Sequence, residues 1–181
     1  SRNMKALNGI INEAEFCPSP NFNDRPAGTE VDLIVVHAIS LPKGIYNTEL
    51  IKDLFLNQLD PREDKFLHSI SHLQVSPHFL ITRLGTLIQF VPIQNRAWHA
   101  GESLFQGRNN CNDFSIGIEL EGCDDDSFEA EQYDSLSELI NFLCGELNIS
   151  RHNIVGHSDI APDRKTDPGP NFNWSLLRSK I

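Results

Sequence analysis

The chain has little that would mark it for a membrane or for export. Its 181 residues contain no apolar run long enough to span a bilayer, and the stretch after Met4 has no apolar core of the signal-peptide type. The four cysteines are scattered without a C-x-x-C pair, at Cys17, Cys111, Cys123 and Cys144. Free thiols of this kind are typical of a reducing compartment, whereas a disulfide framework would need paired spacings. We therefore expect a cytoplasmic protein with no membrane partner.

Positive charge is also scarce. Lys and Arg number 15 against 25 Asp and Glu, which gives a formal net charge of -10. Nucleic acids and anionic membranes bind positive surfaces, so this balance argues against a general role on either partner. Any anionic ligand would have to meet a local basic cluster.

Methionine occurs only once, at Met4, and the preceding residues 1–3 are interpreted as a remnant of cloning. Hydrophobic residues make up 39% of the chain and charged residues 22%, near the averages of globular proteins. No repeat, linker or low-complexity tract divides the sequence. Residues 4–181 are long enough to bury one core, so we expect a single domain, acting as a monomer.

Strands are expected where β-branched, leucine and aromatic residues gather, over residues 31–36, 78–82, 86–91, 115–120 and 153–156. The first run, VDLIVV, is nearly all apolar, which indicates a strand buried on both faces and ending in His37. The second and third runs predict a hairpin, because Gly85 between them can take a positive φ. The last run leads directly into His157.

Two helices are expected between these strands. Apolar residues over 133–147 recur with the spacing of one helix face, and Asp126 or Ser127 is available as the N-cap. A shorter helix is predicted from a Thr48 cap through Phe55. The stretch from Phe66 to Val75 fits neither pattern. The alternation predicts an α/β fold, a single domain with a central mixed β-sheet flanked by helices and a functional site in a surface groove.

Three residues have the types and positions of metal ligands. His37 and His157 each follow an apolar run, so both side chains are placed to emerge at one edge of the sheet. Asp167 follows in a loop stiffened by prolines that could curl back toward His157. Two imidazoles and one carboxylate are the ligand set of a catalytic zinc site, which leaves a fourth position open. Each histidine taken singly is explained as well by an ordinary hydrogen-bonded side chain, so spacing alone leaves both interpretations open.

Seven further segments narrow the choice: PSPNF (18–22), VVH (35–37), ISLPKG (39–44), VSPHFLI (75–81), RAWHAG (96–101), CNDFSIGIELEG (111–122) and IAPDRKTDPGP (160–170). Together they resemble the AmpD-type N-acetylmuramyl-L-alanine amidases, a branch of the zinc amidase and peptidoglycan-recognition fold. The resemblance extends over nearly the whole chain, and its motifs are jointly specific.

The resemblance implies an enzyme and assigns its parts. His37, His157 and Asp167 would hold Zn²⁺, Glu119 would be the catalytic acid/base, and Lys165 would support the oxyanion. The implied reaction is hydrolysis of the amide between the lactyl group and L-alanine in muropeptides. The favoured substrates are small 1,6-anhydro-muramyl peptides from wall turnover, which agrees with a cytoplasmic enzyme of cell-wall recycling.

Smaller roles follow for four other side chains. Trp98 and His99 resemble the wall of the family's substrate groove, where an indole can lie against a sugar or peptide, although tryptophan is equally common in a core. Arg108 and Arg164 are candidates to pair the substrate's peptide carboxylates, against the alternative of solvated surface arginines.

Three positions near these motifs need separate interpretation. Only one of Glu119 and Glu121 is expected to face the site; the family pattern selects Glu119 and leaves Glu121 as a solvated or structural partner. Ala38 stands where the family commonly has asparagine, and Gln74 where it commonly has arginine. Neither is an expected ligand, so these departures affect specificity and leave the chemistry intact.

Two rival functions remain. A non-catalytic peptidoglycan-binding module shares the fold but lacks a metal ligand, whereas this sequence retains all three candidates together with Glu119 and Lys165. A zinc amidase acting on the intact wall would require export, for which no signal is visible.

Overall fold

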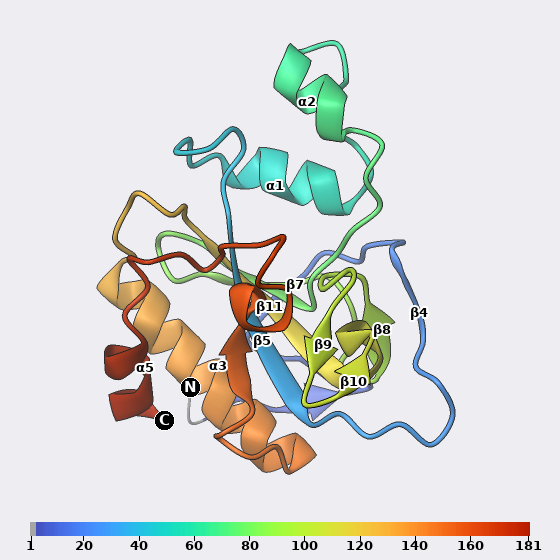
Figure 1. The fold of residues 1–181 in the computed structure, drawn as a ribbon, viewed down its shortest axis with the longest axis vertical. Helices are drawn as coiled ribbons and strands as arrows, with labels where there is room; N and C mark the ends of the chain where they lie inside the picture. Colours follow the sequence, from blue (N-terminus) through green and yellow to red (C-terminus); the bar gives the residue numbers. More distant parts are fainter. Residues whose placement is uncertain (1–2) are drawn as a thin grey trace.

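A six-stranded sheet forms the centre of the molecule (Figure 1). The structure is a computed structural model and describes residues 3–181. In spatial order the strands are β12 (Ile154–Gly156), β5 (Leu33–Ile39), β11 (Ser115–Glu121), β6 (Phe79–Ile81), β7 (Leu87–Gln89) and β3 (Glu15–Phe16). β5 pairs in parallel with β11 and β12, whereas β6 and β7 are antiparallel. The predicted mixed sheet and hairpin are confirmed, and Gly85 in the hairpin turn has a φ of 83°.

Short antiparallel ribbons surround this sheet within residues 3–181. They are β1 (Ala6–Leu7) with β2 (Ile10–Ile11), β4 (Phe22–Asp24) with β8 (Asn95–Ala97), and β9 (Leu104–Phe105) with β10 (Arg108–Asn109). The last ribbon and a 3-10 helix at Cys111–Phe114 occupy a stretch rich in glycine and asparagine. Turn-forming residues there allow the chain to reverse twice before it enters β11.

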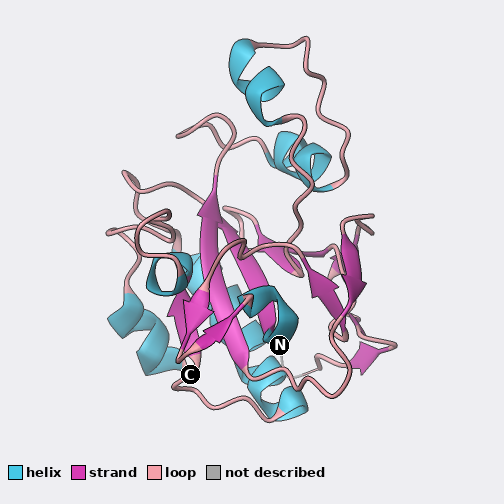
Figure 2. Ribbon diagram, turned by 45° about the vertical axis from the view of Figure 1, so that its right-hand side comes forward, coloured by secondary structure: helices cyan, strands magenta, loops and turns pink. Residues whose placement is uncertain are grey.

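The helices are α1 (Thr48–Phe55), α2 (Lys65–Ile70), α3 (Ala130–Leu147), α4 (His157–Ile160) and α5 (Trp174–Lys180). Figure 1 shows α3 and α5 side by side along one flank of the sheet, and Figure 2 shows α1 and α2 toward one end of it. α2 falls in the stretch that fitted neither helix nor strand by its pattern. Its N-cap is Asp64, whose carboxylate accepts a hydrogen bond from the Leu67 N–H at 2.7 Å.

Both predicted helix caps were wrong. α3 begins at Ala130, and its N-cap is Glu129, whose N–H donates to Gln132 Oε1 at 3.0 Å. Asp126 accepts a hydrogen bond from a tyrosine hydroxyl instead. Asn47 caps α1, since its Oδ1 accepts a hydrogen bond from the Leu50 N–H, and the Thr48 hydroxyl donates to a glutamate in β11. Each expected cap was diverted by a partner distant in sequence.

Strand alternation gives the two faces of the sheet different neighbours. Even-numbered residues of β5 and β11 pack with α3 and α5 in the main core, with Ile34, Val36, Ile116, Ile118 and Leu120 from the strands and Leu136, Leu139, Ile140, Leu143 and Leu177 from the helices. Odd-numbered residues of the same strands point to the opposite face. They include His37 on β5 and Glu119 on β11, so the period of the strands places both polar side chains away from the helical layer.

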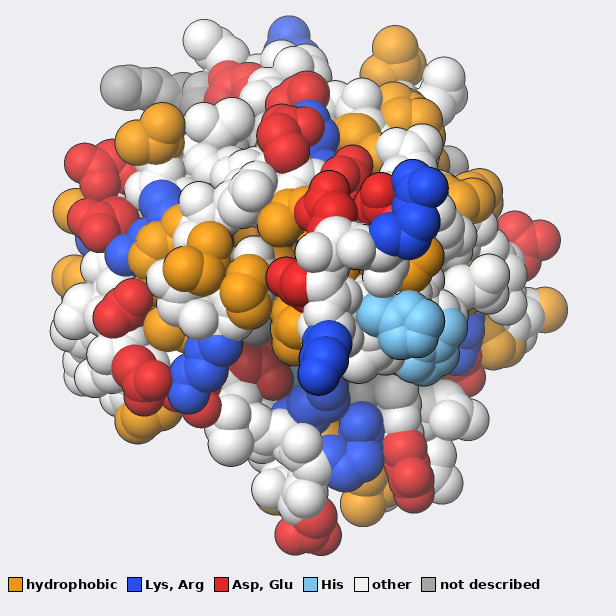
Figure 3. All heavy atoms as spheres, turned by 90° about the horizontal axis from the view of Figure 1, so that it is seen from above, with side chains coloured by type: hydrophobic (Ala, Val, Ile, Leu, Met, Phe, Trp, Pro, Cys, Tyr) orange, Lys and Arg blue, Asp and Glu red, His pale blue; other side chains and the backbone are white. Residues whose placement is uncertain are grey.

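The surface carries charges of both signs. On the face shown in Figure 3, acidic and basic side chains are interspersed with hydrophobic ones, so the net charge is not gathered into one acidic surface there. Within residues 3–181, no helix combines the length and apolarity needed to cross a bilayer.

Candidate active site

The sheet register brings two of the predicted residues together. His37 lies inside β5, which continues two residues beyond it to Ile39, and it pairs directly with Glu119 of β11. On the other side of β5, Val36 pairs with Gly156, the last residue of β12. His157 is the next residue along and therefore lies beside His37. Parallel pairing thus gathers both histidines and one acid at a single edge of the sheet.

The loop after α4 returns Asp167 to the same place. The Ser158 N–H donates to the carbonyl oxygen of Asp167 at 3.0 Å, which closes the loop. Pro168 packs against Gly156, where a Cβ would lie only 2.7 Å from the proline Cδ. A glycine at the end of β12 therefore permits the close approach that places Asp167 beside His157.

Three potential ligand atoms converge at this point. His37 Nδ1 lies 3.0 Å from His157 Nδ1, and each nitrogen lies 3.2 Å from Asp167 Oδ2. Ligand atoms at about 2.0–2.1 Å from a tetrahedral zinc ion are separated by roughly 3.3 Å, so the triangle has the dimensions that such an ion requires. Both histidines are buried, with 1% and 5% of their surface exposed. The three residues form a group that could hold a metal ion.

The ionisation of these groups suits a cation. Burial lowers the pKa of His37, which keeps its imidazole neutral. Burial acts to raise the pKa of the Asp167 carboxyl, but its close contacts with His157 and His37 outweigh burial and lower that pKa. His157 Nε2 donates to the carbonyl oxygen of Ala100 at 2.9 Å, and a carbonyl can only accept. This hydrogen bond places a ring proton on Nε2 of His157, so its Nδ1 is the nitrogen available to bind a metal.

Glu119 faces the same cavity with an unsatisfied oxygen. Its Oε2 lies 3.9 Å from His37 Nδ1, and its buried Oε1 has no hydrogen-bond partner among the described residues. Burial and the nearby charge of Asp167 raise the pKa of this carboxyl well above its usual range, while Lys165 acts in the opposite direction. Buried carboxyls with raised pKa values are typical of proton-transfer groups.

Glu121 has a different environment. Residues two apart on a strand share a face, so strand alternation does not separate it from Glu119; its position further along β11 does. The Glu121 carboxylate accepts hydrogen bonds from the Thr48 hydroxyl at 3.1 Å and from the Arg83 N–H at 3.0 Å. Of the two alternatives left by the sequence, Glu121 is a structural partner.

A cavity of about 260 Å³ opens at the triangle. Besides the three candidate ligands it is lined by Ala38, Ile39, Leu54, Phe55, Leu73, Val75, Ser76, Trp98, His99, Glu119 and Lys165. Its walls are largely apolar, and its polar groups come together at the candidate ligands. Ala38 is part of the wall, whereas Gln74 is exposed and outside it.

Trp98 and His99 both line this cavity but differ in their contacts. The Trp98 indole N–H donates to Asn23 Oδ1 at 2.9 Å, which fixes the ring at the rim. Both ring nitrogens of His99 are occupied, since Nδ1 lies 2.9 Å from His37 Nε2 and Nε2 lies 3.0 Å from Ser115 Oγ. Sequence reasoning missed the contact with His37, because nothing local to His99 indicates a partner 62 residues away.

The two predicted arginines lie outside the cavity lining. Arg164 donates from one nitrogen to the carbonyl oxygens of Ala100 at 3.0 Å and Glu102 at 2.6 Å. Arg108 pairs with Asp32 at 3.0 Å and lies over a phenylalanine ring. The structure therefore brings Arg164 to the backbone behind His157 and does not bring Arg108 to the site.

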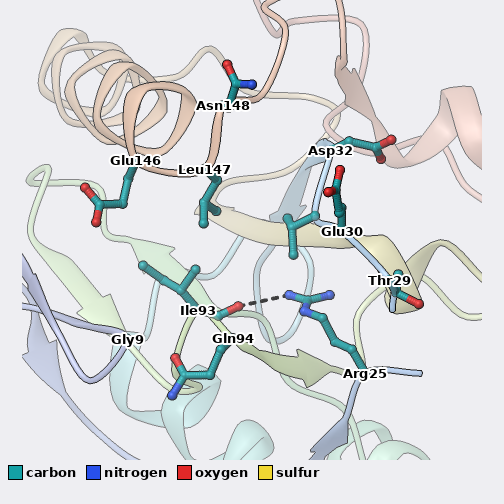
Figure 4. Close-up of a pocket in the computed structure, with 11 residues that line it drawn as sticks. Gly9, Arg25, Thr29, Glu30, Asp32, Ile93, Gln94, Glu146, Leu147 and Asn148 are labelled. Carbon is teal, nitrogen blue, oxygen red and sulfur yellow. Dashed lines mark hydrogen bonds between the residues drawn. The ribbon is translucent and has the colours of Figure 1, made fainter. Parts of the chain in front are cut away.

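A larger cavity, of about 630 Å³, lies near the other end of β5 (Figure 4). The Arg25 guanidinium beside it donates to the carbonyl oxygen of Ile93 at 3.1 Å and to three further backbone carbonyls. Acidic side chains, Glu30, Asp32 and Glu146, also line it. Size alone would favour this cavity, but the convergent ligand atoms and the buried carboxyl of Glu119 belong to the smaller one.

Comparisons with known proteins agree with this geometry. Residues 27–170 match the family described as N-acetylmuramoyl-L-alanine amidase. The 1,6-anhydro-N-acetylmuramyl-L-alanine amidase AmpD of Enterobacter cloacae is 48% identical over 178 residues, covering 98% of this chain and 95% of that protein. AmpD of Escherichia coli strain K12 is 48% identical over 170 residues, with 94% and 93% covered.

Solved structures give the same result. The crystal structure of a Se-Met AmpD derivative superposes with a TM-score of 0.95 at 45% identity, covering 98% of this chain and 99% of that one. Escherichia coli AmiD, in complex with the substrate anhydro-N-acetylmuramic acid-L-Ala-D-gamma-Glu-L-Lys, gives 0.63 at 26% identity, covering 99% of this chain and 66% of that one. The chain belongs to the N-acetylmuramoyl-L-alanine amidase family of hydrolases.

Proposed function

We propose that the chain is a zinc-dependent cytoplasmic amidase that cleaves the lactyl–L-alanine amide of 1,6-anhydro-muropeptides during cell-wall recycling. The observation that carries the proposal is the triangle of His37, His157 and Asp167 beside Glu119, whose buried Oε1 has no hydrogen-bond partner among the described residues. Relatives named for the anhydro substrate match nearly the full chain. A Pseudomonas aeruginosa relative, AmpDh3, is known in complex with anhydromuramic pentapeptide. The free cysteines fit a reducing cytoplasm.

Zinc fits the residues that are present. Two neutral imidazoles and one carboxylate match the donor set of catalytic zinc and leave one coordination position open. When bound there, the ion supplies Lewis acidity, which polarises the amide carbonyl and lowers the pKa of coordinated water to about 7. The carbonyl of Ala100 orients His157 for this role, in the way that outer hydrogen bonds orient metal-binding histidines.

Glu119 is proposed to move the proton. Its unpartnered oxygen is available to take a proton from the attacking water and then to deliver it to the leaving alanine nitrogen. The ammonium of Lys165, which lines the cavity, would stabilise the negative charge that develops on the carbonyl oxygen. The chain thereby provides both a proton carrier and a positive charge in the cavity where the amide is proposed to bind.

The cavity walls suggest how the substrate lies. Trp98 is proposed to pack against the sugar or the first peptide residues, with Leu54 and Val75 completing an apolar wall. Arg164 remains a proposed partner for peptide carboxylates beyond the rim, through the guanidinium nitrogens not held by backbone carbonyls. Arg108 is assigned no part in binding because Asp32 already pairs with it on the surface.

Product analysis by mass spectrometry tests this function. Anhydro- and non-anhydro-muropeptides with the same peptide should both release an intact peptide that begins with L-alanine, and the anhydro form should react faster. Chelation of zinc should abolish turnover and lower the thermal midpoint, and restored zinc should recover both. Cleavage at another bond, or full activity after chelation, would contradict the proposed chemistry. Equal rates on the two sugars would contradict only the anhydro preference.

A further inference from the structure

A buried chain of side chains stands behind His37. Ser115 Oγ lies 3.0 Å from His99 Nε2, and His99 Nδ1 lies 2.9 Å from His37 Nε2. His37 Nδ1, on the far side of its ring, is one corner of the candidate metal triangle. Ser115 is fully buried and His99 is 8% exposed, so water does not compete strongly for these hydrogen bonds.

The backbone of His99 is also held in place. Asn112 Oδ1 accepts hydrogen bonds from the N–H groups of His99 at 3.0 Å and Ala100 at 2.8 Å. The carbonyl of Ala100 in turn accepts from His157 Nε2. Two consecutive residues therefore contact the two histidine ligands, one through a side chain and the other through a carbonyl. Asn112 fixes both at once.

β11 is shaped to receive the His99 ring. A Cβ built on Gly117 would lie 2.4 Å from His99 Cγ, so only glycine leaves room for the imidazole there. Ser115, two residues earlier and on the same face of the strand, supplies the hydroxyl that meets the ring nitrogen. Ser115 and Gly117 therefore lie on the same strand, β11, which pairs with the strand that holds His37.

The sense of the hydrogen bonds decides which atom of His37 can bind a cation. For Nδ1 to offer a lone pair, the ring proton must be on Nε2, and His99 Nδ1 must accept it. His99 then donates from its own Nε2 to Ser115 Oγ. The opposite sense would place a proton on His37 Nδ1 and remove that atom from the ligand set.

We propose that His99 is a positioning residue that holds His37 in its metal-binding tautomer and orientation, with Ser115 and Asn112 holding His99. The inference rests on the proposed zinc site. His99 still lines the cavity, as the interpretation of it as part of the groove wall requires, but neither of its ring nitrogens is left for a substrate. Outer hydrogen bonds of this kind typically change metal affinity about 10- to 100-fold.

Zinc affinity, measured by competition with a chromophoric chelator on metal-free protein, tests the proposal. His99→Leu removes the acceptor at similar volume and should weaken binding about 10- to 100-fold. His99→Asn can place its Oδ1 near the position of Nδ1 and should recover part of the loss. Ser115→Ala, which deletes a single oxygen, should shift affinity in the same direction by a smaller factor. Leu139→Ala, a core position of α3 on the other face of the sheet, is the control: it should lower stability and leave zinc affinity unchanged.

Nitrogen NMR on the zinc-loaded wild-type chain gives an independent readout. His37 and His99 should both carry the ring proton on Nε2. A proton on Nδ1 of His99, or wild-type affinity in both His99→Leu and Ser115→Ala, would overturn the inference while leaving the proposed function in place. A wild-type chain that binds no zinc would overturn both. If His99→Leu fails to fold, Ser115→Ala and the tautomer measurement still decide the matter.

Discussion

Chains carrying His157→Ala or Asp167→Ala are expected to lose their zinc and all measurable turnover on anhydro-muropeptide. Each substitution removes one corner of a triangle whose sides are 3.0–3.2 Å, and two remaining donors are too few for a catalytic zinc site. Elemental analysis should fall from about one zinc per chain to near zero. The thermal midpoint of these chains should no longer rise when zinc is added, because binding stabilises only a chain that holds the ion.

The matched control for this result is the substitution of a cysteine. Cys17→Ser alters a free, partly exposed cysteine that lies outside the site cavity, so zinc content and turnover should both survive. Zinc that persists in His157→Ala and Asp167→Ala but disappears from Cys17→Ser would show that the ion binds elsewhere. Measuring metal and rate on the same preparations keeps partial unfolding from being mistaken for ligand loss.

Local patterns predicted most of the sheet but none of its register. The apolar runs located β5, β11 and β12 because buried parallel strands need continuous apolar residues. The pairing of His37 with Glu119 depends on how two strands 82 residues apart align, which no local pattern encodes. The predictions of the helix N-caps were wrong for a related reason. Asp126 and Thr48 have good capping side chains, but tertiary partners engage both, and Asn47 and Glu129 serve instead.

The candidate ligands could be predicted from sequence because metal sites require particular side chains. His37, His157 and Asp167 stand out by type, and the family resemblance supplied their roles. The residues that support His99 could not be predicted from sequence. Ser, Asn and Gly occur in many roles, and only the structure shows that Ser115, Asn112 and Gly117 surround this ring. For Arg108 the residue type was misleading. Nothing in the local sequence distinguishes a surface arginine that pairs with a carboxylate, as Arg108 does with Asp32, from one that binds a substrate.

Glu119→Gln is expected to depress turnover by about 10²–10⁴-fold while leaving zinc content and substrate binding intact. The amide keeps the shape of the carboxyl but cannot accept a proton from water. Oε1 of Glu119 has no partner among the described residues, so the substitution breaks no hydrogen bond at that atom.

Lys165→Ala removes an exposed ammonium at the cavity and should lower turnover roughly 10²–10³-fold, comparable to the loss of one oxyanion donor.

Glu121→Gln provides the sharpest comparison with Glu119→Gln, because the same chemical change is made two residues along one strand. The Glu121 carboxylate accepts from Thr48 and Arg83 and lies outside the cavity, so its amide should weaken the fold without reducing turnover of the folded fraction. Steady-state kinetics with zinc measured in each preparation separates the two effects. Near-wild-type turnover in zinc-loaded Glu119→Gln would show that its proton is not needed. An equal loss of turnover in both variants would show that strand distortion alone explains the defect. Either result would remove Glu119 from the mechanism.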